Sequence, residues 1–331
     1  MPGTFPYAEH PYGYAPSGEA NPLRAMPGAR KRSAIVAEST QGTTPASPGF
    51  LILRDISISS DVERTDTVSR ERRSDRAAAA MASGLESFQK QIELPFARDA
   101  ATDLLWEAAL CSTFSADVIK NGSTRRPFTL EETYDAAEGA ARRIEGCVVD
   151  EFALALSSNE FGRIRVKLRG LSETTGPNLL PGATYADPTP AHDPVTGADI
   201  AVSNLFGINN PRVVGMSLML SNNTTDRHAF GATAPVGTGL GAFRVIGVVN
   251  LYFTRLEEYS FFMQRRRGLG FDITIGSVPG AKDRLQVFNA DVWDPGVDDP
   301  GSDGDHKVSL HFAAKHSDAD GGVIALTRNV T

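Results

Sequence analysis

The sequence predicts a mainly β protein made of two tandem domains, each with several strands and one flanking α-helix. Three observations predict this fold. Short segments of alternating apolar and polar residues recur along most of the chain, only two segments carry helical spacing, and the order of elements in the first half returns in the second. With 331 residues, 41% of them hydrophobic and 22% charged, the chain is long enough to bury two cores.

Five strands are predicted in the first half. The clearest is "GRIRVKLRG" at 162–170, in which alternate apolar residues share one face while the other face is basic. Because this basic face would attract DNA, we expect its arginines to pair at an interface or to face outward. Its basic residues are Arg163, Arg165, Lys167 and Arg169, and the other predicted strands are 50–59, 85–94, 126–134 and 143–156.

Two helices are predicted. Segment 98–111 places Leu104, Ala108 and Cys111 at helical spacing. Segment 256–267 has acidic residues in its first turn and arginines in its last, which is the order that the helix dipole favours, and Gly268 follows it. The predicted strands of the second half are 213–221, 243–253, 270–276, 283–293, 306–316 and 321–329.

An internal duplication accounts for the repeated order. Both strand-to-helix transitions carry Leu-x-Phe-x-Arg, starting at Leu94 and at Leu251, and the elements that follow come in the same order. Between the halves lies a segment rich in proline and glycine. The predicted divisions are an extended N-terminal arm (1–34), a first domain (35–170), a linker or surface loop (171–211) and a second domain (212–331). The arm is either a disordered tail or a segment that orders on a neighbouring subunit.

Composition excludes several classes of function. A net charge of −7 argues against non-specific electrostatic binding of nucleic acid by the protein as a whole. Two cysteines without a Cys/His cluster form neither a disulfide framework nor a zinc site, and no segment is long and apolar enough to cross a membrane. The glycine-rich segment 235–245 leads into a strand-like run, so it predicts a hairpin or mobile loop rather than a phosphate cradle.

No catalytic, cofactor or metal site is predicted. His306, His311 and His316 are five apart on a strand and cannot meet at one metal. The acid-rich loop 294–305 lacks the order of a calcium loop, so a solvated loop is favoured over a weak calcium site. Carboxylates are abundant, and a site built on paired acids stays open, but nothing marks one.

A dense charged stretch occupies positions 63–76, where five arginines face four acids. A DNA-binding groove would leave the positive charge uncancelled, whereas interleaved signs favour pairing within the chain or with an identical copy. A solvated loop or a flexible hairpin tip is the alternative. The candidate subunit-interface residues are Arg70, Glu71, Arg72, Arg73, Asp75 and Arg76.

Three segments resemble the tail tube proteins of long, non-contractile-tailed bacteriophages. Residues 38–45 match a Glu-x-Thr-x-Gly-Thr-x-Pro pattern, and residues 69–76 match a Ser-x-Glu-x-Arg-x-Asp-Arg pattern. Segment 85–110 resembles the strand and "LLWEAAL"-type helix that follow in that family. The resemblance covers roughly 35–330, whereas the arm and the insert at 294–305 depart from it. The matching residues of the first two patterns are Glu38, Thr40, Gly42, Thr43 and Pro45, then Ser69, Glu71, Arg73, Asp75 and Arg76.

The resemblance implies a tube of stacked rings, without catalytic residues or cofactors. Each ring holds six β-sandwich-like domains whose inner sheets join between subunits around a channel. Because the chain carries two such domains, we expect three chains per ring with pseudo-sixfold symmetry, and six chains as the alternative. The implied partners are further copies of the chain, a tape measure protein and DNA held non-specifically in the lumen, and tail terminator and tail-tip proteins at the ends. The implied location is the virion, with assembly in the host cytoplasm.

Two other functions compete with the tube. A baseplate or tail-tip ring protein of the same fold would form discrete rings rather than long filaments. A β-sandwich carbohydrate-binding module would need an exposed aromatic platform, whereas Trp106 lies on a predicted helix and Trp293 borders the acidic loop.

Overall fold

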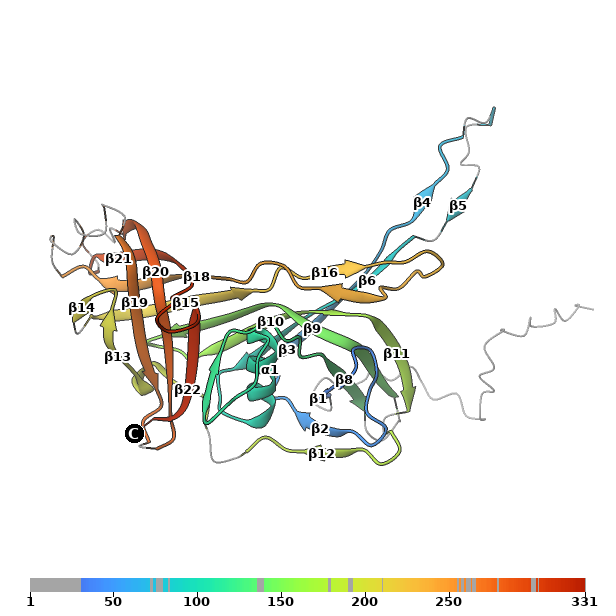
Figure 1. Cartoon of the computed structure of the whole chain (residues 1–331), viewed down its shortest axis with the longest axis horizontal. Coiled ribbons are helices and arrows are strands. Elements are labelled where there is room, and N and C mark those ends of the chain that lie inside the picture. Colours follow the sequence, from blue (N-terminus) through green and yellow to red (C-terminus); the bar gives the residue numbers. More distant parts are fainter. Residues whose placement is uncertain are drawn as a thin grey trace, which may run out of the picture.

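The computed structural model describes residues 31–330, apart from short gaps and most of the segment 255–265, in which Leu256, Tyr259 and Met263 are described. The gaps are 72–73, 76–79, 83, 136–139, 178–179, 190–192, 210, 279, 299–301 and 303. Strands dominate the described residues (Figure 1).

The first half of the chain is a β-sandwich with one helix across its open side. One sheet has the antiparallel order β3-β6-β10-β9, and the other joins β1, β8, the first part of β9, and β11. The long strand β9 bends from one sheet into the other. The elements are β1 (Arg32–Ala37), β2 (Gly49–Ile52), β3 (Ser57–Arg64), β4 (Thr67–Val68), β5 (Met81–Ala82), β6 (Glu86–Pro95), α1 (Ala100–Leu110), β7 (Val118–Lys120), β8 (Phe128–Asp135), β9 (Ala140–Ser157), β10 (Arg163–Gly170) and β11 (Ser172–Pro177).

The second half repeats this order of pairing. One sheet runs β15-β18-β21-β20, and the other joins β13, β19, the first part of β20, and β22. Each strand of these two sheets therefore has a counterpart in the first half, as the internal duplication predicts. The elements are β12 (Thr184–Ala186), a 3-10 turn (Gly197–Asp199), β13 (Ile200–Leu205), β14 (Ile208–Asn209), β15 (Val213–Ser221), β16 (Thr225–Arg227), β17 (Gly237–Gly239), β18 (Arg244–Tyr252), β19 (Arg266–Ile275), β20 (Lys282–Asp298), β21 (Lys307–Ala314) and β22 (Ile324–Val330).

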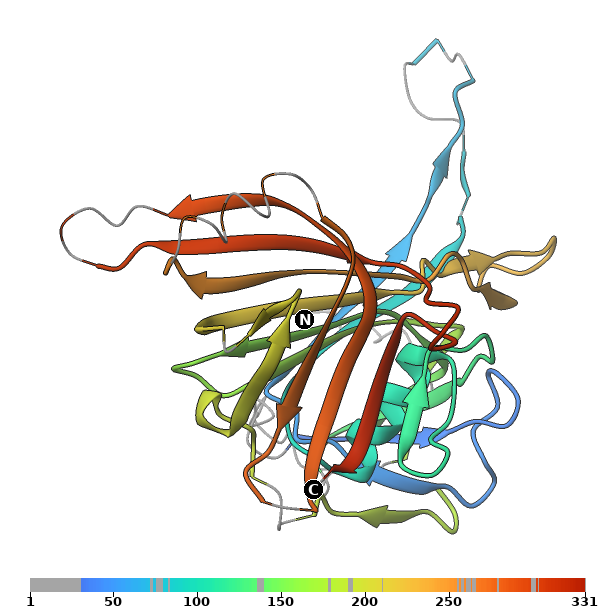
Figure 2. The same ribbon diagram turned by 60° about the vertical axis from the view of Figure 1, so that its left-hand side comes forward.

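The two halves are joined by main-chain pairing between β9 and β15. These strands are antiparallel neighbours from Gly215 opposite Ser157 to Ser221 opposite Glu151. One sheet therefore crosses the whole chain in the order β3-β6-β10-β9-β15-β18-β21-β20, which we call the continuous sheet. Figure 2 shows it passing from the green strands of the first half through the yellow β15 to the orange strands of the second.

The cores lie on one face of the continuous sheet because apolar residues alternate along its strands. In β10, Ile164, Val166 and Leu168 are buried while their neighbours face solvent. Most of the buried apolar residues of both halves form one cluster, to which the junction contributes Leu154 and Leu218. An antiparallel sheet with one apolar face packs that face against a second sheet and leaves its other face in solvent, which is the arrangement seen here.

A glutamate of the early motif ties the loop after β1 to the first sandwich. Glu38 is buried, and its carboxylate accepts hydrogen bonds from the Gly146 amide at 2.8 Å, the Thr129 hydroxyl at 2.7 Å and the Gly42 amide at 2.7 Å. Gly42 has a φ of +83°, which glycine adopts without strain. This part of the motif is therefore structural.

Several sequence predictions need correction. The predicted strand 50–59 is two strands, β2 and β3, and Arg266 and Arg267, predicted at the end of a helix, lie in β19. Segment 171–211, predicted as a linker or loop, contains β11 to β14, which pair with β9, with β2, with β19 and with each other. Residues 32–34 of the predicted arm belong to β1.

Other predictions fall partly or wholly outside the described residues. Leu256, Tyr259 and Met263 are helical, and the remainder of the second predicted helix up to residue 265 is not described. Residues 1–30 of the arm also lie outside the described part. The domain boundaries stay predictions.

Helix α1 begins at an N-cap that we expect to stabilise the first half measurably. Asp99 is extended, and its Oδ1 accepts a hydrogen bond from the Thr102 amide at 2.8 Å. Replacing Asp99 with alanine removes this acceptor and is expected to cost about 0.5–2 kcal/mol of unfolding free energy, measured by urea denaturation. Asp99→Asn is the control because it keeps the acceptor, and equal losses in both variants would contradict the capping role.

Candidate functional site: the solvent face and open edges of the continuous sheet

The solvent face of the continuous sheet carries the basic residues predicted from the sequence. Each is paired with an acidic residue of a neighbouring segment. Arg163 lies 3.0 Å and Arg165 3.5 Å from the carboxylate of Glu93 on β6, and Lys167 lies 2.6 Å from that of Glu151 on β9. The strand order places β10 between β6 and β9, so the cations have acids on both sides.

Arg169, near the end of β10, is paired with acidic residues in the same way. Its guanidinium lies 3.5 Å from Asp150 of β9 and 3.4 Å from Asp226 of β16. The hydrogen bond from Arg163 lowers the pKa of Glu93 below its ordinary value, so this carboxylate is charged at neutral pH. These cations were expected to pair at an interface or to face outward, and the structure pairs each of them within the chain.

The described residues of the charged stretch, 63–71 and 74–75, lie in a hairpin that begins at the end of β3 and projects from the body (Figure 1). Thr65 donates its amide to the Leu85 carbonyl at 3.0 Å, and Ser69 donates to the Ala80 carbonyl at 2.8 Å. Of the six candidate interface residues, Arg70, Glu71 and Asp75 are described, and all three are exposed at the end of this hairpin. Arg72, Arg73 and Arg76 lie outside the described residues.

The second half has a matching hairpin, β16–β17, which lies against the first half. The Ser87 hydroxyl donates to Asp226 at 2.8 Å, the Glu86 amide donates to the Thr233 carbonyl at 2.9 Å, and Gln41 donates to the Thr238 hydroxyl at 2.8 Å. The glycine-rich segment 235–245 was predicted to form a hairpin or a mobile loop, and its first residues form one strand of this hairpin. Its contact with the first half, however, joins residues more than 100 positions apart and has no local signal in the sequence.

The continuous sheet ends at two open edges. Among the described residues, β3 pairs only with β6, and the last residues of β20, Gly296–Asp298, pair only with β21. Apolar side chains are exposed along these edges, where Ile56 is 56%, Val62 42% and Val297 42% accessible. At the internal junction, by contrast, the apolar residues Leu154 and Leu218 are each 1% accessible. Such edges are templates for pairing with another chain.

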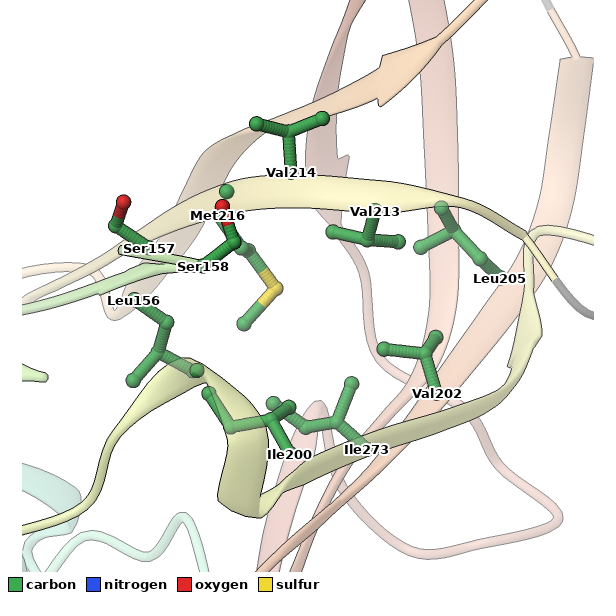
Figure 3. Close-up of a pocket in the computed structure, with 12 residues that line it drawn as sticks. Leu156, Ser157, Ser158, Ile200, Val202, Leu205, Val213, Val214, Met216 and Ile273 are labelled. Atoms are coloured by element: carbon green, nitrogen blue, oxygen red, sulfur yellow. The ribbon is translucent and has the colours of Figure 1, made fainter. Parts of the chain in front are cut away.

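A small cavity lies beside the internal junction and does not resemble a catalytic site. Its volume is about 70 Å³, and its lining comes from the end of β9, from β13, from the start of β15 and from β19. Figure 3 shows Met216, Val202 and Ile273 pointing into it. The lining contains no titratable side chain, so the cavity offers no acid, base or charged ligand.

Two further features are absent from the described part of the chain. The described residues hold no group of three or more His, Cys, Asp and Glu side chains placed to bind a metal ion. Within the same residues, no helix has the length and apolar character needed to span a membrane.

A comparison with protein families decides how this arrangement is to be understood. The family model of phage tail tube proteins matches residues 28–314, which is most of the chain. The chain belongs to the phage tail tube protein family. A comparison with curated proteins found no match. This tail tube protein is therefore a structural component of a phage tail, and open, mainly β sheets with exposed edges suit a subunit that assembles with copies of itself.

Sequence reasoning located some of this site and missed the rest. It found the basic strand β10 and the charged hairpin in this tail tube protein. It predicted only the first residues of the edge strand β3, within 50–59, because the second half of that strand, from Asp61 to Arg64, is mostly charged and alternates poorly. It also missed the open end of β20, which lies in the segment predicted as a solvated acidic loop.

Proposed function

We propose that this chain is the tail tube subunit of a long, non-contractile-tailed phage, and that it assembles into stacked rings that form a hollow conduit for DNA. One observation carries the proposal: a single chain holds two copies of the same sheet unit, joined edge to edge, with an open edge at each end. If further copies join edge to edge in the same direction, the continuous sheet has no unpaired edge once the ring closes. Three chains then supply six sheet units, and rings of six chains are the alternative.

The charge on the solvent face suits a lumen through which DNA slides. Duplex DNA binds surfaces whose lysines and arginines are free to replace its counterions. Here the cations of β10 are neutralised by Glu93, Glu151, Asp150 and Asp226. In this proposal the solvent face lines the channel, where it holds DNA and a tape measure protein without sequence preference, and terminator and tip proteins close the two ends.

The charged hairpin is proposed to contact other subunits. Interleaved signs among the candidate interface residues, of which Arg70, Glu71 and Asp75 are described, fix the register of docking between identical copies more than they add affinity. The hairpin projects from the body, where a neighbouring chain can reach it (Figure 1).

Electron microscopy of the purified protein tests the proposal. We expect hollow rods with a regular axial repeat, assembled without a nucleic acid. Discrete rings that never lengthen would support a baseplate or tail-tip ring protein instead. A chain that stays monomeric at high concentration would contradict both functions and return attention to a binding module.

The lumen charge gives a separate prediction. Replacing Glu93 with glutamine removes the partner of Arg163 and Arg165 and leaves two cations exposed on the proposed channel wall. Tubes of this variant are expected to retain short duplex DNA at about 50 mM salt and to release it by about 200 mM, because counterion release weakens with salt. Retention is measured by co-sedimentation of labelled DNA with the tubes.

A control variant in the other sheet distinguishes the effect of charge on the proposed channel wall from the effect of the net charge of the protein. Glu173 pairs with Arg142 on β9 and lies on β11, in the other sheet of the sandwich. Glu173→Gln changes the net charge equally, and its tubes are expected to release DNA as the natural protein does. Equal retention by both variants would show that the solvent face of the continuous sheet does not line the channel.

A further inference from the structure

The internal junction between the two halves has a counterpart at the ends of the chain. Within the chain, β9 of the first half pairs with β15 of the second. The counterpart of β9 in the second half is β20, and the counterpart of β15 in the first half is β3. These two counterparts are the two open edges of the continuous sheet.

The strand register identifies the counterpart of each residue on the β20 side. Leu94 and Leu251 hold the same place in the two Leu-x-Phe-x-Arg segments. Opposite them lie Ile164 on β10 and Val308 on β21, so these two residues are counterparts as well.

One further step across the sheet reaches the edge. Ile164 lies opposite Leu154 of β9, and Val308 lies opposite Val297 of β20. Val297 is therefore the counterpart of Leu154, which is buried at the internal junction, whereas Val297 is exposed.

The same reasoning applies to the β3 side. Ser60 lies opposite Lys90 of β6, and Leu218 lies opposite Gly247 of β18. Lys90 and Gly247 each stand four residues before the equivalent leucines of the two repeats. Ser60 is therefore the counterpart of Leu218, and Leu218 lies directly opposite Leu154 at the internal junction.

Main-chain hydrogen bonds point the same way. At the internal junction the Val214 carbonyl accepts a hydrogen bond from the Ser158 amide. Because alternate residues of a strand direct their amide and carbonyl groups to the same side, the even-numbered residues of β15, including Leu218, face β9. In the first half, Thr65 donates its amide to Leu85, so the odd-numbered residues of β3 face β6. The amide of Ser60 then points out of the open edge, in the direction of its counterpart.

The hairpins repeat as well. In β4–β5, Thr67 pairs with Ala82, and in β16–β17, Thr225 pairs with Gly239. Thr67 and Thr225 each follow the counterparts Ser60 and Leu218 by seven residues, and Ala82 and Gly239 each precede Lys90 and Gly247 by eight. Yet β16–β17 lies against the first half of the same chain, whereas β4–β5 projects from the body (Figure 1).

We propose that the contact between neighbouring chains in a ring copies the internal junction. β3 of one chain pairs antiparallel with the open end of β20 of the next, with Ser60 opposite Val297 of the partner subunit, and the β4–β5 hairpin lies against the second half of that partner. The partner is a second copy of this chain, and the inference rests on the proposed self-assembly. The pairing closes both open edges and covers the exposed apolar residues Val62 and Val297.

Paired cysteines test this register in the assembled protein. Ser60→Cys and Val297→Cys in one chain place two thiols at opposite positions of the proposed strand pair, within the Cα separation of about 4.4–6.8 Å that a disulfide spans. After assembly and mild oxidation, we expect most chains to run as covalent multimers on a denaturing gel without reductant. The ladder of species should end at the closed ring, at three chains for a three-chain ring.

Matched pairs test the register itself. Val62→Cys or Ile58→Cys, each combined with Val297→Cys, keeps the same face but shifts the pair by two residues, to about 7–8 Å between Cα atoms. These variants are expected to cross-link at least tenfold less. Asp61→Cys with Gly296→Cys is the next pair in the proposed register and should cross-link, which provides a second test if the first pair disturbs folding.

The outcomes separate this junction from the proposed function. Rods that form normally but cross-link through a shifted pair, or through none, overturn the junction and leave the tube function standing. A natural protein that forms neither rods nor rings overturns the tube function, and the junction with it. The native thiols Cys111 and Cys147 are buried, and the unsubstituted protein serves as the control for them.

Discussion

Replacing Lys90 with methionine is expected to lower the unfolding free energy of the chain by about 3–5 kcal/mol. The Lys90 ammonium lies 2.7 Å from the carboxylate of Glu132, and both side chains are almost completely buried between the sheets of the first half. Burial is the largest influence on Lys90 and lowers its pKa, while Glu132 counteracts it. Removing the lysine leaves a buried carboxylate with Lys31 as its remaining cationic neighbour at 3.1 Å.

A double-mutant cycle tests this expectation. Combining Lys90→Met with Glu132→Leu removes both charges, so the double variant should regain most of the lost stability. Urea denaturation of the unassembled chain, followed by the fluorescence of buried Trp106, measures all four members of the cycle. A double variant that loses the sum of the two single losses would show that the pair is not coupled.

This pair illustrates where prediction from the sequence ends. Alternation in 85–94 correctly predicts a strand with Phe88, Ile92 and Leu94 on its core face, and Lys90 lies on that same face. Its partner is 42 residues away, so no local pattern marks the lysine as buried. The alternation specifies which face of the strand points inward. Only the packing of one sheet on the other specifies which side chains come into contact on that face.

The strands within 171–211 were missed for a related reason. A strand can be recognised from its own residues when it fills a core, as β15 does at its predicted bounds 213–221. β11 and β12 instead add to sheets whose cores other strands fill, and they are rich in threonine, alanine and polar residues. Their strand structure depends on main-chain pairing with β9 and β2, which composition does not record.

The candidate site divides in the same way. The basic face of β10 is a local pattern and was predicted, whereas the acids that neutralise it come from β6, β9 and β16. The duplication was predicted from Leu-x-Phe-x-Arg, but the direct pairing of β9 with β15 was not, since a Pro- and Gly-rich segment lies between them. That pairing is what turns two similar units into one sheet with two open ends.

Replacing Ser60 with proline is expected to prevent assembly while leaving the single chain folded. The Ser60 amide points out of the open edge of β3, so proline removes a donor that the ladder to β6 does not use. At the proposed junction the carbonyl opposite would stay buried and unsatisfied, which costs about 1–3 kcal/mol. A three-chain ring contains three such junctions, and the penalty per ring is then about 3–9 kcal/mol.

The matched variants make this result specific to the edge. Ser60→Ala keeps the amide and should assemble normally, whereas Ser59→Pro removes an amide that faces β6 and should destabilise the unassembled chain itself. Electron microscopy measures rod formation at one protein concentration for all variants, and urea denaturation measures the stability of each chain. Rods of normal number and length from Ser60→Pro would show that the β3 edge is not paired between chains. Because β3 is one of the two open edges of the continuous sheet, the contact between subunits would then have to use other surfaces of the chain.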